Sequence, residues 1–431
     1  MPKLRGIANG LVWVLVTLAT QSVESRATIP PDVPLVNRPG VGTRALGMGG
    51  ASVGVSEDYH ALAINPAGLA QLRRVEFGLE FKRKSITSDA TYLGETHSVP
   101  LDKTRIQSIG FAYPFPTYRG ALVVGMSYQR VADLDQDYYR AGRGGEIQSE
   151  VETIFEEGSV GAYQAGFAVA ASPKLNLGAT ATFYSGGSDR ERSFTYRSTN
   201  GIDRERTNTT QEMDIHAISG SLGALVQLRP DLRLGLSLHL PESFTLEGSG
   251  DDDIVRVGTE PPDTLDILEP YTFSDELTLP ARFSAGLAWT RNGWLASADA
   301  AIADWKQIDY YGPLRTEERE YVYRTEVDLR LGVEYTFPNT PLRLRAGYAS
   351  QPVAYRPIAT DVFRGEFAFA DFEQDRRTWS FGGSVLLEES MMLEAAYVTG
   401  GYERRGRSPR GVETIEKLDQ NDLLVGVTFR L

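Results

Sequence analysis

Residues 321–337 alternate between apolar and polar side chains almost without exception. Successive side chains of a β-strand point to opposite faces, so this period of two predicts one strand with an apolar face and a charged face. A strand of about 17 residues is longer than most strands of globular sheets. It suits a tilted strand that crosses a bilayer and projects beyond it. We expect the face with Leu329 and Leu331 to meet lipid and the face with Asp328 and Arg330 to meet the lumen of a barrel.

The same alternation recurs along most of the chain. About fourteen segments show it, with approximate limits at 74–84, 104–114, 119–132, 157–172, 174–187, 211–228, 232–247, 273–290, 294–308, 321–337, 341–353, 376–388, 391–405 and 421–431. The connections between them alternate between short and long. The short connections are 172–173, 229–231, 291–293, 338–340 and 389–390. We expect the long connections to be polar loops, at 85–103, 133–156, 188–210, 248–272, 354–375 and 406–420.

This asymmetry of the connections separates a membrane barrel from the soluble all-β folds. Tight turns on one rim and long loops on the other are typical of outer-membrane barrels, whereas a sandwich or a propeller gives no reason for the difference. The predicted fold class is therefore all-β, a transmembrane antiparallel β-barrel of about fourteen strands. Aromatic residues also gather at the short turns, as expected for an interfacial girdle, and they include Tyr113, Phe115, Trp289, Trp294, Tyr335 and Phe337.

The first residues have the pattern of a targeting signal. Lys3 and Arg5 precede the apolar run 11–18, and Ser25-Arg26-Ala27 resembles a small-residue cleavage site. We interpret residues 1–27 as a signal peptide, because the apolar run is too short to span a membrane comfortably. The expected location of the mature protein is the outer membrane of a Gram-negative-type bacterium.

Composition removes several classes of function. Lys and Arg number 44 against 57 Asp and Glu, which gives a formal net charge of −13. This excess argues against a nucleic-acid partner, which would need a basic face. The chain has no cysteine, which excludes disulfides, cysteine-ligated metals and a lipoprotein anchor. The four histidines have no metal-binding spacing, and we expect no metal and no cofactor.

Residues 28–73 differ from the alternating segments that follow. They are rich in small residues around Gly47, Gly49 and Gly50 and lack a strand pattern. A barrel of about fourteen strands would leave a wide lumen if nothing filled it, and glycine allows close backbone approach. We expect residues 28–73 to fold inside the lumen as a plug and residues 74–431 to form the transmembrane barrel.

Two motifs within this segment resemble a known family. The run GTRALGMGGA at 42–51 is followed by the acidic pair Glu57-Asp58 and then by NPAGL at 65–69. Together these motifs resemble the N-terminal signature of the FadL-type outer-membrane transport proteins. Members of that family import hydrophobic molecules, chiefly long-chain fatty acids or aromatic hydrocarbons, and an N-terminal hatch fills their lumen.

The resemblance implies passive uptake of a hydrophobic small molecule such as a long-chain fatty acid, with a shift of the hatch and exit through a gap in the wall. The hatch residues that it implies are Gly47, Met48, Gly49, Gly50, Asn65, Pro66 and Ala67. The same signature is similar to that of PorV-like barrels, which serve as shuttles or scaffolds in protein secretion. A secretion-system protein is therefore the alternative partner, and the polar, charged loops are compatible with it.

The charges expected in the lumen allow two interpretations. Arginine binds carboxylates with bidentate geometry, and the candidates for holding a ligand head group are Arg324, Arg330, Arg343 and Arg345. The lumenal charges have mixed signs, however, which favours ion pairs between the wall and the N-terminal segment.

We expect no enzymatic activity and no catalytic residues. The string Gly50-Ala51-Ser52-Val53-Gly54 matches the G-x-S-x-G pattern of hydrolases, but it lacks the strand-to-helix context of a nucleophile elbow. An open porin is a third hypothesis, and a glycine-rich segment in the lumen argues against it.

Residues 421–431 form an amphipathic strand in which Leu423, Val425, Val427 and Phe429 share one face. A barrel closes by pairing its last strand with its first, so such a strand is expected here. It also resembles the C-terminal recognition signal of outer-membrane proteins, which usually ends in Phe where this chain has Leu431. The expected partners are therefore outer-membrane lipid and the barrel-assembly machinery.

Overall fold

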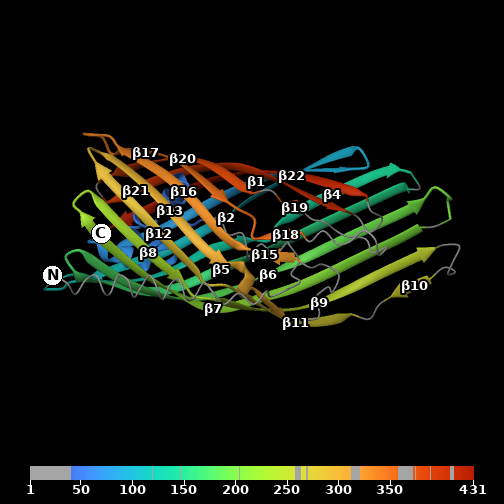
Figure 1. Cartoon of the computed structure of the whole chain (residues 1–431), viewed down its shortest axis with the longest axis horizontal. Coiled ribbons are helices and arrows are strands. Elements are labelled where there is room, and N and C mark those ends of the chain that lie inside the picture. The colour runs from blue at the N-terminus through green and yellow to red at the C-terminus, as the bar shows by residue number, and fades with distance from the viewer. Residues whose placement is uncertain are drawn as a thin grey trace.

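The computed structural model describes residues 40–118, 120–145, 147–202, 204–257, 264–267, 270–311, 321–357, 372–373, 375–388, 390–407 and 412–431. A closed, antiparallel barrel of fourteen strands accounts for most of them (Figure 1). The expected signal peptide lies outside the described residues. Within the part of the chain that is described, no helix is long and apolar enough to cross a membrane.

The first six wall strands follow the order of the chain. They are β1 (Glu76–Tyr92), β2 (Glu95–Phe115), β3 (Leu122–Asp133) with its continuation β4 (Gln136–Gly144), β5 (Ile147–Ser172), β6 (Leu175–Ser198) and β7 (Arg204–Arg229).

The next three wall strands are each divided into two pieces. They are β8 (Leu232–His239) with β9 (Glu242–Val257), β12 (Arg282–Arg291) with β11 (Tyr271–Leu279), and β13 (Trp294–Asp304) with β14 (Asp309–Tyr311). The short 3-10 helix η2 (Trp305–Gln307) separates β13 from β14.

The last five wall strands are β16 (Thr325–Thr336), β17 (Leu342–Gln351), β20 (Arg376–Leu387), β21 (Met391–Arg407) and β22 (Glu413–Arg430). Pairing of β1 with β22, from Glu76↔Arg430 to Tyr92↔Thr414, closes the barrel. Four short strands are not counted among the fourteen wall strands. β10 (Thr264–Ile267) pairs with β9, β15 (Tyr321–Tyr323) pairs with β18 (Tyr355–Pro357), and β19 (Phe372–Glu373) pairs with β21.

The strand alternation predicted from the sequence is confirmed in β16. Leu329 and Leu331 are each 54% exposed on the outer face, whereas Asp328 and Glu334 are buried on the inner face. The predicted start of this strand at residue 321 was wrong, because β16 begins at Thr325. Tyr323 belongs to β15 and is buried in an apolar cluster rather than exposed to lipid.

Several connections predicted to be long polar loops are strands instead. Residues 85–103 continue β1 and β2 to a tight turn at Leu93-Gly94, and residues 133–156 and 188–210 likewise extend β3 to β7 as paired hairpins. The outward side chains of the β1 extension, such as Thr87 and Asp89, are polar, while Ala90 and Tyr92 on the other face are buried. Without an apolar, lipid-facing row, these segments lack the alternation that predicts a membrane strand. Short turns predicted within the described residues are present, including Asn292-Gly293, where both residues have positive φ as a tight hairpin turn requires. Residue 389 of the turn predicted at 389–390 lies outside the described residues.

The seam between β2 and the adjoining strands β3 and β4 is held differently from the rest of the wall. Described backbone pairing between β2 and β3 covers Ser108–Phe115. Farther out, ion pairs reach across this seam from β2: Arg105 binds Asp135, between β3 and β4, at 2.8 Å and Glu157 on β5 at 2.7 Å, and Lys103 binds Glu157 at 3.1 Å.

Candidate functional site

Residues 40–72, the N-terminal segment, pack against the inner face of the barrel wall. The segment contains two short helices, α2 (Thr43–Gly47) and α3 (Ala61–Ile64), and the 3-10 helix η1 (Pro66–Gln71). Met48, Leu62 and Leu69 have no exposed surface. The segment lies toward the end of the barrel where the C-terminus is found (Figure 1).

Pairs of glycines in the wall receive this segment. Gly332 and Gly347 are direct partners in the β16–β17 ladder, and a Cβ at either position would overlap the backbone of Met48 or Gly49. Glycine in a strand allows such close backbone approach. Three further cross-strand pairs are arranged in the same way: Gly78 and Gly110 against the ring of Tyr59, Gly178 and Gly223 against Asn65 to Ala67, and Gly235 and Gly286 against Val53 and Gly54.

The glycines predicted in the segment meet the same wall. Gly49 and Gly50 adopt φ of 66° and 77°, a region that favours glycine. The Gly49 N–H donates to the hydroxyl of Ser380 at 2.8 Å. Gly47 lies against the Cα of Gly382 on β20.

The NPA sequence at 65–67 is anchored by the side chain of Asn65. Its amide nitrogen donates to the carbonyl oxygens of Val53 at 2.9 Å and Ala224 at 3.2 Å, and its oxygen accepts from the N–H of Ala67 at the start of η1. Asn65 thus links two parts of the segment to β7.

A buried ion-pair chain ties α2 to the wall. Arg44 donates to both carboxylate oxygens of Glu334 at 3.0 Å and to Glu57 at 2.6 Å. Arg345 donates to Glu334 at 2.6 Å and lies 2.9 Å from Glu394. Alternating signs compensate each charge, which burial otherwise makes costly.

His60 forms a second buried link. Its Nδ1 lies 3.3 Å from Asp58 and its Nε2 lies 3.2 Å from Glu80. Burial alone would lower the pKa of His60, but the carboxylates of Glu80 and Asp58 outweigh that effect and raise it well above its usual value. Burial likewise opposes ionisation of Asp58, and His60 outweighs it and lowers the Asp58 pKa to about 2.

Three neighbouring wall strands break at the same level. His239 on β8 pairs with Arg282 on β12, and Glu242 on β9 pairs with Leu279 on β11. The residues between them, including Pro241 and Pro280, interrupt both strands because proline has no N–H to donate. On the next strand, η2 separates β13 from β14. The expectation of continuous strands at 232–247, 273–290 and 294–308 was therefore wrong at these points.

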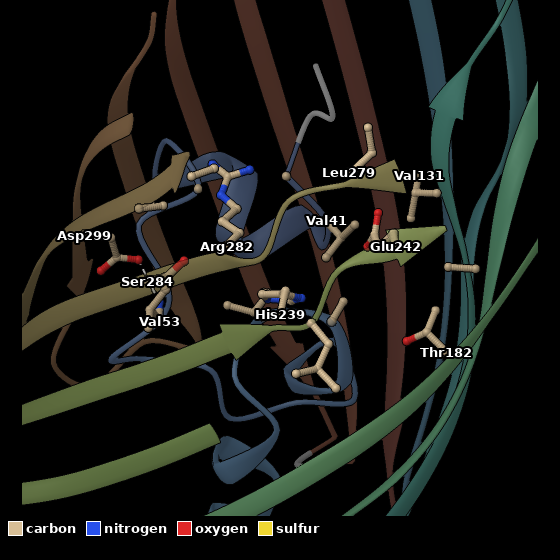
Figure 2. A pocket seen from close by; sticks show the side chains of 18 of the residues that line it. Val41, Val53, Val131, Thr182, His239, Glu242, Leu279, Arg282, Ser284 and Asp299 are labelled. Atoms are coloured by element: carbon tan, nitrogen blue, oxygen red, sulfur yellow. Dashed lines mark hydrogen bonds between the residues drawn. The ribbon is translucent and has the colours of Figure 1, made fainter. Parts of the chain in front are cut away.

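A cavity of about 190 Å³ lies between this row of breaks and the N-terminal segment. Figure 2 shows Val41 and Val53 of the segment among the wall residues His239, Glu242, Leu279 and Arg282. The breaks change which side chains face inward, so His239 and Glu242, three residues apart, both line the cavity. No residue of this cavity except Gly50 and Arg330 was among the candidates from the sequence.

An apolar cluster continues from the cavity farther into the barrel. It includes Leu279, Trp305 and Tyr184, which also line the cavity, and Phe244, Leu277 and Ile308 beyond it. The interiors of open porins are polar and water-filled. A buried apolar cluster on the inner face of the wall is therefore a distinctive feature of this barrel.

The four arginine candidates occupy different places. Arg330 lines the cavity, 3.5 Å from Asp328. Arg345 is fully buried in the Glu334 ion-pair chain, and Arg343 lies at its edge, 4.0 Å from Glu334. Arg324 lies away from the other three and donates to the carbonyl of Val353 at 2.7 Å.

The G-x-S-x-G string at 50–54 is part of the contact between the N-terminal segment and the wall. The Ser52 hydroxyl donates to the carbonyl of Gly50, and its N–H donates to Asp299. Among the described residues, no group of three or more His, Asp or Glu side chains could hold a metal ion.

The cavity could not be located from the sequence, but two signals pointed toward it. Pro241 and Pro280 fall inside predicted strands, where proline marks a break. The paired glycines of the wall, such as Gly332 and Gly347, also fall at inward positions of predicted strands. Only the register shows that these features surround one space.

Comparisons with known proteins agree with the fold. A family model described as BamG matches residues 40–356. No curated protein matches the chain. A solved FadL homologue of Pseudomonas aeruginosa is similar in structure, with a TM-score of 0.66, 14% sequence identity, and coverage of 94% of this chain and 99% of the other.

Two solved toluene transporters are also similar in structure. TodX of Pseudomonas putida has a TM-score of 0.63 and 16% identity, with 91% of this chain and 99% of that chain covered. TbuX of Ralstonia pickettii has a TM-score of 0.59 and 14% identity, with 92% and 100% covered. At these identities the likeness establishes a FadL-like barrel fold.

Proposed function

The chain belongs to the BamG family, and we propose that it is an outer-membrane barrel through which small hydrophobic compounds pass without chemical change. The observation that carries this proposal is the apolar cluster on the inner face of the wall, continuous with the cavity beside the N-terminal segment. The interior of a pore for polar solutes is itself polar, so such a surface is not expected there. The similar solved structures are a FadL homologue and two toluene transporters, which is consistent with this substrate class.

The outer face of the barrel supports a membrane location. Large apolar side chains are exposed all around the ring, for example Phe81 on β1, Phe167 on β5 and Phe381 on β20. Water would make such a surface unfavourable, whereas lipid covers it. The outer membrane of a Gram-negative-type bacterium is the compartment in which barrels of this kind reside.

We assign the N-terminal segment the role of a plug. Its buried ion pairs and the glycine pairs fix it tightly, so a free swing of the whole segment would break Arg44–Glu334 and expose both charges. A compound that reaches the cavity is then expected to leave sideways. The seam between β2 and β4 is the candidate exit. Among the described residues no backbone ladder joins these two strands, ion pairs from Arg105 to Asp135 and to Glu157 on β5 cross the seam, and Val131 beside it lines the cavity.

Uptake of a labelled compound tests the proposal. Cells without their own transporter would express the chain, and entry of labelled toluene and of a labelled long-chain fatty acid would be compared with cells that carry an empty vector. We expect toluene to enter cells that express the chain faster than cells with the empty vector. We expect a smaller effect for the fatty acid, because a cavity of about 190 Å³ is small for an extended long chain. Equal rates with and without a correctly assembled barrel for both compounds would count against it.

A second candidate function rests on a different surface. Asp189 faces Glu212 across the β6–β7 ladder and Asp214 faces Glu247 across β7–β9, all on the exposed outer face. Like charges directly opposite each other destabilise a sheet, so a basic protein partner would offset the repulsion between these carboxylates. This favours a scaffold of the PorV-like kind or a partner of the barrel-assembly machinery, and purification at low and high salt would reveal a stoichiometric protein released by salt.

A further inference from the structure

One corner of the cavity carries the donors that a ligand would meet first. Arg282 and Ser284 lie two residues apart on β12, so both side chains point inward, and Figure 2 shows them on the same side of the cavity. Arg282 begins the strand directly after the break at Pro280 and Ala281. Without the break, the alternation of the strand would direct this side chain toward lipid.

The positive charge of Arg282 is already compensated. Its Nη2 binds the carboxylate of Asp328, which also lies 3.5 Å from Arg330. Asp299 supplies another negative charge beside Arg330 and accepts from the N–H groups of Ser52 at 2.6 Å and Val53 at 2.7 Å. The two carboxylates balance the two arginines, so this corner has no excess positive charge to attract an anion.

Farther along, the cavity is lined by a carboxylate. Glu242 lines it and accepts from the hydroxyl of Tyr184 at 2.6 Å. A carboxylate ligand would approach this group at close range and be repelled. The charges thus disfavour fatty-acid anions and other carboxylates, although two arginines line the cavity.

Hydrogen-bond donors remain at the corner. A guanidinium has five N–H donors, and the bond to Asp328 uses Nη2. The Arg282 side chain is 31% exposed and lines the cavity. The Ser284 hydroxyl lines it from a residue that is only 7% exposed. Because nearby carboxylates compensate the charge of Arg282, these donors favour an uncharged oxygen acceptor over an anion.

The rest of the lining sets the size and character of the ligand. Val41, Ile64, Leu279 and Trp305 supply apolar surface. A cavity of about 150 Å³ lined by aliphatic and aromatic side chains is known to bind benzene. A volume of about 190 Å³ leaves room for one ring and small substituents.

We propose that this cavity binds an uncharged single-ring compound with an oxygen substituent, such as a phenol, and that Arg282 and Ser284 hydrogen-bond the oxygen. This inference rests on the proposed function and narrows its substrate class. Arg282 and Ser284 are then the residues that distinguish oxygenated compounds from plain hydrocarbons.

Three ligands of nearly the same shape provide the test: toluene, p-cresol and 4-methylbenzoate. Binding to the purified full-length barrel would be measured by equilibrium dialysis at pH 7, with identical detergent micelles on both sides so that partitioning cancels. We expect p-cresol to bind about tenfold more tightly than toluene and 4-methylbenzoate to bind most weakly. Ser284→Ala should lower p-cresol affinity severalfold and leave toluene unchanged. Ser221→Ala, a buried inner-face serine on β7 outside the cavity lining, is the matched control.

The outcomes separate the two proposals. Toluene binding as tightly as p-cresol, or an unchanged p-cresol affinity in Ser284→Ala, overturns the inference and leaves hydrophobic passage intact. Tightest binding of 4-methylbenzoate also overturns it, since the site would then select an anion. Binding of none of the three to a correctly folded barrel contradicts the inference and the proposed function together.

Discussion

Gly332 and Gly347 lie directly opposite each other in the β16–β17 ladder, and the backbone of Met48-Gly49 lies against both. A Cβ at Gly347 would overlap the N–H of Gly49. The inner face of the wall therefore fits this segment closely. The other three glycine pairs make similarly close contacts with the segment elsewhere around the barrel.

Gly347→Ala should loosen the N-terminal segment without unfolding the barrel. The methyl group cannot be accommodated unless the Met48-Gly49 backbone moves, and overpacking of this kind costs about 1–3 kcal/mol. Limited proteolysis should cut within residues 40–72 faster in the variant. Gly383→Ala is the control, because a Cβ there meets its nearest neighbour at 3.3 Å. Equal protease resistance of Gly347→Ala and the parent chain would contradict this account.

Arg44→Met should destabilise the protein strongly. It removes one partner of a buried pair and leaves Glu334 and Glu57 short of a positive charge, a change that typically costs about 3–5 kcal/mol. Urea unfolding, followed by the shift in electrophoretic mobility, would measure it. Arg83→Met, which breaks an exposed pair with Asp102, should change the midpoint little. Similar midpoints for the two variants would refute the structural role of Arg44.

Attachment of the N-terminal segment should depend on pH through His60 and Asp58. The raised pKa of His60 means that its stabilisation is complete below its ordinary value, about 6.5, and is lost as pH rises through the raised value. The lowered pKa of Asp58 means that its stabilisation is complete above about pH 4 and is lost as pH falls toward 2.

Protease resistance of residues 40–72 across this pH range checks the prediction. His60→Gln should weaken attachment near neutral pH and abolish the alkaline loss, while His97→Gln, on β2 outside the segment, should behave like the parent chain. Release of the parent segment already between pH 6 and 7 would show that the His60 pKa is not raised.

The seam between β2 and β4 should open more readily when its carboxylates are removed. Asp135→Asn with Glu157→Gln takes away both partners of Arg105, so toluene entry should increase if exit through the seam limits passage. Asp102→Asn, elsewhere on β2, is the control. Unchanged entry in the double variant would argue that the exit lies elsewhere.

The barrel could be predicted from the sequence because lipid imposes a simple rule. A strand with one face in hydrocarbon alternates between apolar and polar residues. In β16, Leu329 and Leu331 alternate in this way with Asp328 and Arg330. The extensions at 85–103 could not be predicted, since their outward residues, such as Thr87 and Asp89, are polar and the apolar, lipid-facing row is missing. The N-terminal motif at 65–67 pointed to residues that pack on the wall, with Asn65 as the anchor.

The cavity, by contrast, depends on long-range register. His239 and Glu242 both face inward only because β8 and β9 are out of frame with each other, and Arg282 joins them because the neighbouring strand breaks at the same level. The prolines mark the breaks, but nothing local in the sequence says that two breaks adjoin. Of the four arginine candidates, only Arg330 reaches the cavity, and the sequence does not distinguish it from the others.

A pair of substitutions on neighbouring residues of β6 tests the central claim most directly. Thr182 lines the cavity, and Ala181 beside it faces outward. Entry of labelled toluene would be measured in cells that express Thr182→Phe or Ala181→Phe at matched surface levels. If hydrophobic compounds pass through the cavity, Thr182→Phe should reduce entry about tenfold or more and Ala181→Phe should leave it unchanged. Equal entry through both variants would contradict passage through this cavity.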